Sequence, residues 1–402
     1  MQIVVQKYGG SSLSTLEKID LLAAKLAERE RGHDKLVLVV SAMGETTNEL
    51  TRMAYELTSA PPARELDMLL ATGEQQSIAL MAMALHKYGV DAISYTGSQV
   101  GLKTDTLHTQ AKVIGVNSEK ILKQVEKGKV VIVAGFQGVT AEDDVTTLGR
   151  GGSDITAMAL AVALKAERLE KCTDADGVYT ADPRLYPEAK RIDRLSYEEM
   201  LEMSFAGAKV LHPRAVFFAW KYRIPILVKH AHIEGKGTWI EELEESVEQP
   251  IISNVTQDAT IAKLTVYGVP DRPGMACKIF ETLASHDVTP DMIVQSTTMR
   301  DVNDISFTIK RGELAKAKAA LESLAQDYPG MEVQAEEKVA KISLIGLGIR
   351  SDAHVATGMF RALADEGINI QMIATSDVKI SCVIEEAQLK AGVRALCRKF
   401  FL

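Results

Sequence analysis

The sequence predicts an α/β protein with a mostly parallel sheet, followed by two smaller units that repeat one pattern of strands and helix. The first part is predicted by short runs of buried-strand character, such as Lys35–Val40 and Val130–Ala134, which alternate with segments of helical periodicity up to residue 250. The second part is predicted by an internal repeat beyond residue 260.

Composition limits the possible functions. A chain of 402 residues with 46% apolar and 25% charged residues is typical of a globular protein of two or three domains. Its net charge of −8 gives no electrostatic reason to expect nucleic acid or a membrane as partner. The chain has neither a leader-like start nor an apolar run of about 18 residues, so we expect a cytoplasmic location by default. The four cysteines form no CxxC pair, which argues against a zinc site.

The first strand, around Ile3–Val5, leads into Lys7 and the glycine-rich turn Gly9–Ser11. Glycines let backbone amides approach a phosphate closely, and a lysine at the strand end supplies positive charge. An ordinary turn is the alternative interpretation of such a triplet.

The second strand leads into Ser41 and Thr47. Ligands of open α/β sheets bind beyond the carboxyl ends of strands, so both hydroxyls are candidate substrate contacts. The next helix is predicted over 72–88, where Thr72 and Gln75 form a capping-box pattern. Glu74 would then lie in the first turn, where stabilising the helix dipole is the alternative to a binding role.

A second glycine-rich turn, Gly149–Asp154, precedes a helix predicted over Ile155–Ala166. Helix-start amides favour anions, and Arg150 offers a bidentate fork for a carboxylate. Ser153 or Asp154 could instead simply cap the helix, in which case losing the cap would cost about 1 kcal/mol. The functional alternative is a divided phosphate site shared with the turn after the first strand.

Two further segments carry polar groups. The loop 173–184 is dense in hydroxyls and carboxylates, which suits a nucleotide-binding edge but also fits a plain surface loop. Lys209 lies shortly before a His-Pro turn and could equally be an ordinary surface lysine.

The acidic stretch 241–248, with Pro250 after it, predicts a linker. Beyond it, residues 264–293 and 342–373 repeat the order strand, turn, helix, strand. Tandem units of this kind indicate a paired small-ligand-binding module, and duplication for structure alone is the alternative.

In this order, the motifs resemble the aspartokinase family of amino acid kinases, from residue 2 to the C-terminus. The matching stretches are KYGGSS, SAMGETTNEL, ATGEQQ, GFQGVTAEDDVTTLGRGGSD, TDADGVYTADPR and GAKVLHPRAV, and the repeat resembles two ACT domains, the first opening with GVPDRPGMA. The resemblance implies an amino acid kinase-like sandwich with a mostly parallel central sheet over 1–250. It also implies two α+β ACT-type regulatory domains over 251–335 and 336–402, and leaves open whether 251–262 pairs with the second.

The implied activity is transfer of the ATP γ-phosphate to the β-carboxylate of L-aspartate, giving 4-phospho-L-aspartate, the first step of lysine, threonine and methionine biosynthesis. The resemblance implies Mg²⁺ held mainly by the ATP phosphates, with no protein metal site. It also implies feedback inhibition through the ACT domains by lysine, alone or with threonine, and a homo-oligomer formed through the same domains.

Residue roles follow from the same resemblance. Lys7 and Asp154 are the implied catalytic residues, with Asp154 orienting Lys7 and Lys209 around the transferred phosphoryl. Arg150 would bind a substrate carboxylate, and Glu74 the α-ammonium. The implied substrate residues are Ser41, Thr47, Glu74, Arg150 and Ser153. The implied nucleotide residues are Lys7, Gly9, Gly10, Ser11, Thr173, Asp174, Tyr179, Arg184 and Lys209. The regulatory candidates are Asp271, Gly274, Ala276, Asp291, Gln295, Asn369 and Ser376, the two aspartates for their negative charge toward an ammonium.

The sequence departs from the family pattern at Cys172, where a tyrosine is usual, at His230, and at Asp352–His354, where a His-Pro-Gly run is common. Two other functions stay open at this point. One is an amino acid kinase for another carboxylate, such as glutamate or N-acetylglutamate. The other is a non-catalytic amino-acid sensor that kept the kinase fold.

Overall fold

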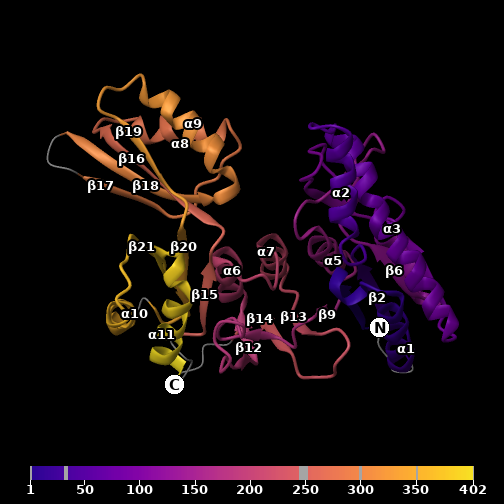
Figure 1. Cartoon of the computed structure of the whole chain (residues 1–402). Coiled ribbons are helices and arrows are strands. Elements are labelled where there is room, and N and C mark those ends of the chain that lie inside the picture. Colours follow the sequence, from indigo (N-terminus) through magenta and orange to yellow (C-terminus); the bar gives the residue numbers. More distant parts are fainter. Residues whose placement is uncertain (1, 31–34, 244–251, 298–300, 350–351, 402) are drawn as a thin grey trace. The chain divides into compact units, whose positions relative to one another are not determined.

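The computed structural model describes residues 2–30, 35–243, 252–297, 301–349 and 352–401, and it divides into two compact units (Figure 1). Unit 1 comprises Met1–Val178, Arg191–Ser204 and Lys209–Ser246, and unit 2 comprises Tyr179–Lys190, Phe205–Ala208 and Val247–Leu402. Most of the predicted linker, from residue 244 onward, lies outside the described residues. None of the described helices combines the length and apolar character that a membrane crossing requires.

Unit 1 is built on an eight-stranded sheet in the order β12-β14-β13-β9-β1-β2-β6-β3. Its strand pairs are parallel except β13 with β14, which confirms the prediction of a mostly parallel sheet. The strands are β1 (Ile3–Tyr8), β2 (Lys35–Val40), β3 (Ala92–Tyr95), β6 (Val130–Ala134), β9 (Arg168–Thr173), β12 (Arg194–Ser196), β13 (Ile226–His230) and β14 (Thr238–Glu241).

Helices cover both faces of this sheet. Strand residues alternate between the faces, so Leu36 and Leu38 join the core under α1 and α3, while Val37 and Val39 face the other side, where α5 contacts β1, β2 and β9. The helices of this part are α1 (Leu16–Glu30), α2 (Thr46–Leu57), α3 (Ala63–Lys87), α4 (Glu119–Glu126), α5 (Gly152–Ala163), α6 (Tyr197–Ala206) and α7 (Pro213–Tyr222), with one 3₁₀ turn, η1 (Gly10–Leu13).

A smaller sheet in unit 1 has the order β5-β4-β7-β8. Its strands are β4 (Leu102–Thr104), β5 (Val113–Val116), β7 (Gln137–Val139) and β8 (Val145–Thr147), and a short pair is formed by β10 (Val178–Tyr179) and β11 (Arg191–Ile192). Because β7 and β8 connect β6 to α5, this sheet sets the path of the chain into the second glycine-rich turn.

The predicted start of the helix over 72–88 is wrong. Helix α3 begins at Ala63, after Pro62, and Thr72 lies in its interior, where its hydroxyl donates to the Leu69 carbonyl at 2.7 Å. Gly73 therefore does not break the helix. A Cβ atom there would come within 2.9 Å of the Ala42 side chain, so glycine allows close packing in mid-helix.

Unit 2 contains two four-stranded antiparallel sheets, in the orders β17-β18-β16-β19 and β15-β20-β22-β21. Each carries two helices, and a further apolar cluster joins the two sheets around Met292 and Met372, which occupy matching positions of the repeat. The strands are β15 (Asn254–Asp258), β16 (Ile261–Pro270), β17 (Ile293–Thr297), β18 (Val302–Lys310), β19 (Glu332–Glu336), β20 (Val339–Ile345), β21 (Met372–Thr375) and β22 (Lys379–Glu385). The helices are α8 (Met275–Ala284), α9 (Leu314–Ala325), α10 (Ala353–Asp365) and α11 (Leu389–Phe401), with 3₁₀ turns η2 (Arg311–Glu313) and η4 (Glu386–Gln388).

The segment 179–190 belongs to unit 2 although it lies far from the repeats in sequence. Its backbone accepts hydrogen bonds from β15, where Asn254 Nδ2 reaches the Tyr179 carbonyl at 2.7 Å and the Val255 amide reaches Thr180 at 2.8 Å. Its Tyr186 is buried in the apolar core beneath β20 and β22. Strand β15 itself pairs with β20, so residues 254–258 join the sheet of the second repeat.

Candidate functional site

The first glycine-rich turn is fixed to the loop after the neighbouring strand. The Ser41 amide donates to the Tyr8 carbonyl at 3.1 Å, and the Gly44 amide donates to the Gly10 carbonyl at 3.0 Å. A Cβ atom on Gly10 would lie 2.7 Å from the Ala42 carbonyl oxygen, so only glycine fits there. The carboxyl ends of β1 and β2 therefore present one joined backbone surface beside Lys7.

The second glycine-rich turn starts α5 without a side-chain cap. Gly151, at a φ of 72°, is the N-cap residue, which corrects the prediction that Ser153 or Asp154 caps the helix. A Cβ atom on Gly151 would lie 2.5 Å from His212, so the turn packs tightly against the His-Pro segment. Because Gly151 takes the capping position, the Asp154 carboxylate is free for another role.

Asp154 holds two ammonium groups. Its Oδ1 lies 2.9 Å from Lys7 Nζ and its Oδ2 lies 2.5 Å from Lys171 Nζ, and all three residues are more than 90% buried. Burial alone would raise the pKa of the Asp154 carboxyl, but the charges of Lys171 and Lys7 outweigh it and hold that pKa below its usual value. Burial lowers the pKa of Lys171 to about 8 against the attraction of Asp154.

The sequence analysis predicts that Asp154 orients Lys7 and Lys209. The structure corrects the second of these partners, which is Lys171. Lys171 occupies the second carboxylate oxygen, because it stands in β9 directly opposite Lys7 of β1 in the sheet register. Lys209 is exposed and follows the end of α6. Sequence reasoning missed Lys171, although a lysine two residues before the predicted nucleotide loop was a usable signal.

Glu74 projects from the interior of α3 and is 3% exposed. Its Oε1 accepts from the Ala42 amide at 3.1 Å, while its Oε2 is buried and has no hydrogen-bond partner in the described part of the chain. Burial raises the pKa of this carboxyl to about 7, opposed in part by the Ala42 amide and the Lys7 charge. A first-turn dipole role is therefore excluded, and the free oxygen is suited to a cationic ligand.

The remaining substrate candidates differ in exposure. Ser41 and Thr47 are half-buried, the latter in the first turn of α2. Arg150 is exposed, so its guanidinium is accessible to a ligand. Ser153 is buried against Gly135, where a Cβ atom would lie 2.6 Å from the Ser153 hydroxyl.

The nucleotide candidates fall into both units. Thr173 and Asp174 belong to unit 1, where the Thr173 hydroxyl donates to Asp174 at 3.0 Å. Tyr179 and Arg184 belong to unit 2, where the Arg184 guanidinium forms two bonds with Asp182 at 2.7 and 3.0 Å.

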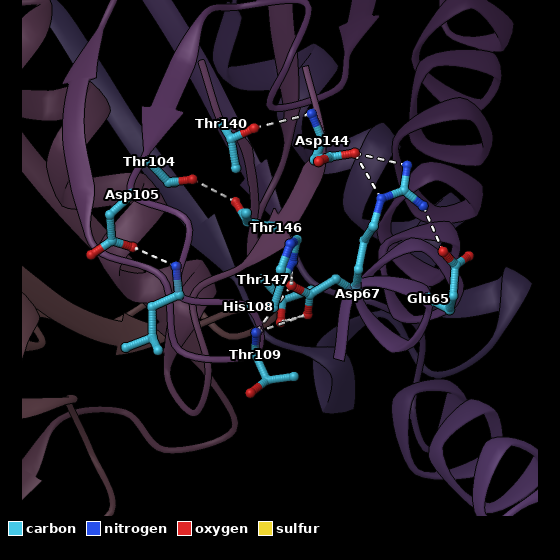
Figure 2. Close-up of polar contacts among 12 residues, drawn as sticks. Glu65, Asp67, Thr104, Asp105, His108, Thr109, Thr140, Asp144, Thr146 and Thr147 are labelled. Atoms are coloured by element: carbon cyan, nitrogen blue, oxygen red, sulfur yellow. Dashed lines mark hydrogen bonds and ion pairs between the residues drawn. The ribbon is translucent and has the colours of Figure 1, made fainter. Parts of the chain in front are cut away.

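Sequence reasoning missed a buried carboxylate, Asp67, whose polar contacts are shown in Figure 2. Asp67 of α3 is fully buried and accepts from the Thr147 hydroxyl at 2.6 Å and from the Thr109 amide at about 3.0 Å, and the His108 ring nitrogen lies 2.8 Å away. The Thr109 carbonyl in turn limits the space at Gly149, where a Cβ atom would approach it to 3.0 Å. Asp67 thus fixes the loop against which the residue before Arg150 packs.

The regulatory candidates lie on exposed parts of unit 2. The Asp271 carboxylate accepts from Asn303 Nδ2 at 2.9 Å, and Gly274 has a φ of 96° as the N-cap of α8. The Asp291 carboxylate is already paired with the buried ammonium of Lys341, so the expectation that it offers free charge is corrected. The other candidates are also exposed: Ala276, Gln295, Asn369 and Ser376.

The chain is similar to known proteins in both sequence and structure. Residues 2–230 match the model of the amino acid kinase family, and residues 264–324 and 342–400 match an ACT domain. Curated aspartate kinases from Pseudomonas putida and Bacillus subtilis are 48% and 43% identical over 100% of this chain and 98% of their own length. A structure of E. coli aspartokinase III in complex with aspartate and ADP, in its R-state, matches with a TM-score of 0.85 at 25% identity over 100% of both chains. The same enzyme in complex with lysine and aspartate, in its T-state, gives a TM-score of 0.78 at 26% identity, again over 100% of both chains.

Proposed function

This chain belongs to the aspartokinase family of amino acid kinases, and from that premise we propose that it transfers the γ-phosphate of ATP to the β-carboxylate of L-aspartate. The product is 4-phospho-L-aspartate, which opens the biosynthesis of lysine, threonine and methionine. The observation that carries this proposal is that one site contains both an unpartnered carboxylate oxygen and an excess of positive charge. Glu74 has a buried oxygen without a partner, and two buried ammonium groups share the single carboxylate of Asp154.

The chemistry requires charge neutralisation and alignment. The attacking carboxylate of aspartate is ionised at pH 7, since its pKa is about 3.9, so no general base is needed. The side chain of Arg150 would hold the α-carboxylate of aspartate, and Glu74 would hold its ammonium group. The β-carboxylate would then face Lys7. Lys7 then offsets negative charge on the transferred phosphoryl, and the amides of the two glycine-rich turns cradle the phosphates.

Magnesium is proposed to enter this site with the nucleotide. Both oxygens of Asp154 face ammonium groups. Mg²⁺ would be held mainly by the ATP phosphates, where it supplies further charge neutralisation.

The direct test is initial-rate ADP formation with L-aspartate, compared with L-glutamate and N-acetyl-L-glutamate. We expect turnover with aspartate alone. Preference for another of these acids would assign the chain a different substrate, and tight amino-acid binding without turnover of any acid would identify a sensor instead.

The aspartate KM is expected to depend on pH through Glu74. Because the pKa of this carboxyl is raised to about 7, acidification protonates it and removes the charge that holds the substrate ammonium. If only the ionised form binds, the KM for aspartate rises roughly tenfold for each pH unit below 7, while the KM for ATP changes little. Initial rates from pH 5.5 to 8.5 measure this.

Glu74→Gln keeps the size of the side chain and removes the charge. It should raise the aspartate KM at pH 8 and abolish the pH dependence. Glu65→Gln, on the exposed face of the same helix, is the matched control and should behave as the unmodified protein does. A pH dependence that survives in Glu74→Gln would assign it to another group.

Regulation is expected to act through unit 2. Lysine, alone or with threonine, would bind near the start of α8, with its ammonium on Asp271 and its carboxylate on amides left open by Gly274 and Ala276. Gln295, Asn369 and Ser376 would complete the effector site. The exposed side chains of Ile293 and Ile373, on edge strands β17 and β21, support a homo-oligomer formed through the ACT domains.

Asp271→Ala should relieve inhibition by lysine and leave uninhibited turnover nearly intact. Losing one charged contact would remove most of the preference of the effector for the inactive state, where a hundredfold preference corresponds to about 2.7 kcal/mol. Inhibition curves with lysine, threonine and both measure the effect. Asp327→Ala, an exposed aspartate after α9, should leave the curves unchanged. Indifference of the unmodified protein to millimolar lysine and threonine would exclude this effector site.

A further inference from the structure

The cluster formed by Lys7, Asp154 and Lys171 has a net positive charge. Two ammonium groups contact one carboxylate, and each of the three residues is more than 90% buried. Burying an unbalanced charge is unfavourable unless an opposite charge joins it. Glu74, which feels the charge of Lys7, is assigned to the substrate ammonium and has a pKa of about 7, so it is only partly ionised at neutral pH.

Strand register places the second ammonium beside the first. Lys171 of β9 is the direct neighbour of Lys7 of β1, and both point to the face of the sheet that α5 covers. Asp154 lies in the first turn of α5, so both ammonium groups lie close to a helix N-terminus that itself favours anions. Lys171 also precedes the nucleotide candidate Thr173 by two residues on the same strand.

We propose that Lys171 is a second catalytic lysine of this kinase, which contacts the γ-phosphoryl group beside Lys7 and is held in place by Asp154. The proposal rests on the assignment of Lys7 and Asp154 to phosphoryl transfer. No bond to Lys171 forms or breaks. Its ammonium compensates the charge that accumulates when an anionic carboxylate approaches an anionic phosphoryl group, which is the largest electrostatic obstacle in this reaction.

A catalytic role and a purely structural role predict different effects on stability when Lys171 is replaced. If Lys171 served only to balance Asp154, replacing it would leave a buried carboxylate short of a partner and would destabilise the fold. Because Lys7 already balances Asp154, Lys171→Met instead removes the excess charge. We therefore expect its melting temperature to be equal to or above that of the unmodified protein, while turnover falls roughly 100-fold or more, the effect of losing one charge-stabilising donor.

Comparing the affinities for two nucleotides, one with and one without a γ-phosphate, tests whether Lys171 contacts that phosphate. Isothermal titration with adenylyl imidodiphosphate, which carries a γ-phosphate, and with ADP, which lacks one, is made on the full chain with Mg²⁺. Lys171→Met should weaken binding of the first much more than that of the second. An equal loss for both, or turnover within threefold of the unmodified protein, would overturn the proposal.

The pH profile gives a second readout. The groups that face Lys171 are Lys7 from β1, Asp154 from α5 and, by its electrostatic interaction, His212 from the adjoining turn. With a pKa near 8, Lys171 loses its charge above that pH, so kcat/KM for ATP should decline on the alkaline side. In Lys171→Arg, which stays protonated, the decline should vanish, and its persistence would count against the role.

Lys229→Met is the matched control. Lys229 forms an equally short ion pair, 2.5 Å from Glu170, on the opposite face of the same sheet. Because Arg168 still pairs with Glu170 at 2.9 Å, this variant should change the melting temperature little and leave kcat within a few-fold. Aspartate turnover by the unmodified protein in the same assay separates the two proposals, because activity that survives Lys171→Met refutes the role of this lysine without affecting the kinase assignment.

Discussion

Asp154→Asn is expected to abolish phosphoryl transfer. The substitution keeps the shape of the side chain and removes the carboxylate that forms ion pairs with both the Lys7 and the Lys171 ammonium groups. Without it, both ammonium groups are misplaced or deprotonated, and kcat should fall on the order of 10³-fold, more than the loss of one donor produces. A coupled ADP-release assay at saturating aspartate and ATP measures this.

Stability should also fall, which distinguishes this site from a helix cap. A cap would cost about 1 kcal/mol, whereas removing one partner of a buried ion pair costs about 3–5 kcal/mol. Asp20→Asn, which breaks the exposed Lys87 pair at 2.7 Å, is the control and should change neither turnover nor melting temperature appreciably. Near-normal turnover in Asp154→Asn would show that the carboxylate is not needed for transfer.

Asp67→Ala is expected to produce the second large effect. Removal of this carboxylate leaves the Thr109 amide and the Thr147 hydroxyl without their partner and the His108 ring without its polar contact (Figure 2). Unsatisfied buried groups cost about 1–3 kcal/mol each, so a total near 3 kcal/mol and a melting temperature lowered by roughly 6–12 °C are expected. Scanning calorimetry or circular dichroism measures the shift.

The same variant should weaken aspartate binding without touching the substrate. The Thr109 carbonyl packs at Gly149, so a loosened loop releases the turn that aims Arg150. We expect a several-fold higher KM for aspartate and a smaller change for ATP. Glu65→Ala, on the exposed side of α3, should alter neither quantity. Normal stability of Asp67→Ala would mean that solvent or rearranged side chains replace the lost bonds.

Local patterns predicted the parts of the site that are local in sequence. The turns after Lys7 and before Asp154 were found because closely spaced glycines mark phosphate-binding backbone. The alternation of strands and helices gave the parallel sheet, since buried parallel strands read as continuous apolar runs. Glu74 was found, but its environment was mistaken, because Thr72 and Gln75 were interpreted as a capping box at a helix start, whereas α3 begins at Ala63.

The missed residues depend on contacts distant in sequence. Lys171 meets Asp154 only through the register of β9 against β1, and Lys341 meets Asp291 only through the packing of one repeat on the other. Asp67 lies inside a helix whose start was misplaced, and its partners come from a loop and a strand. No periodicity or spacing encodes such pairings, because each requires two elements to be placed first.

The membership of 179–190 in unit 2 bears on how such chains can be recombined. A chimaera joined near residue 250 would combine the regulatory half of one relative with a segment that evolved against the β15 and β20 of another. The Asn254 bond to the Tyr179 carbonyl and the buried Tyr186 would then face foreign partners, in the stretch that carries two proposed nucleotide contacts. A functional exchange of the ACT repeats therefore has to exchange residues 179–190 and 205–208 with them. The unit to be exchanged is thus encoded by separate segments of the gene.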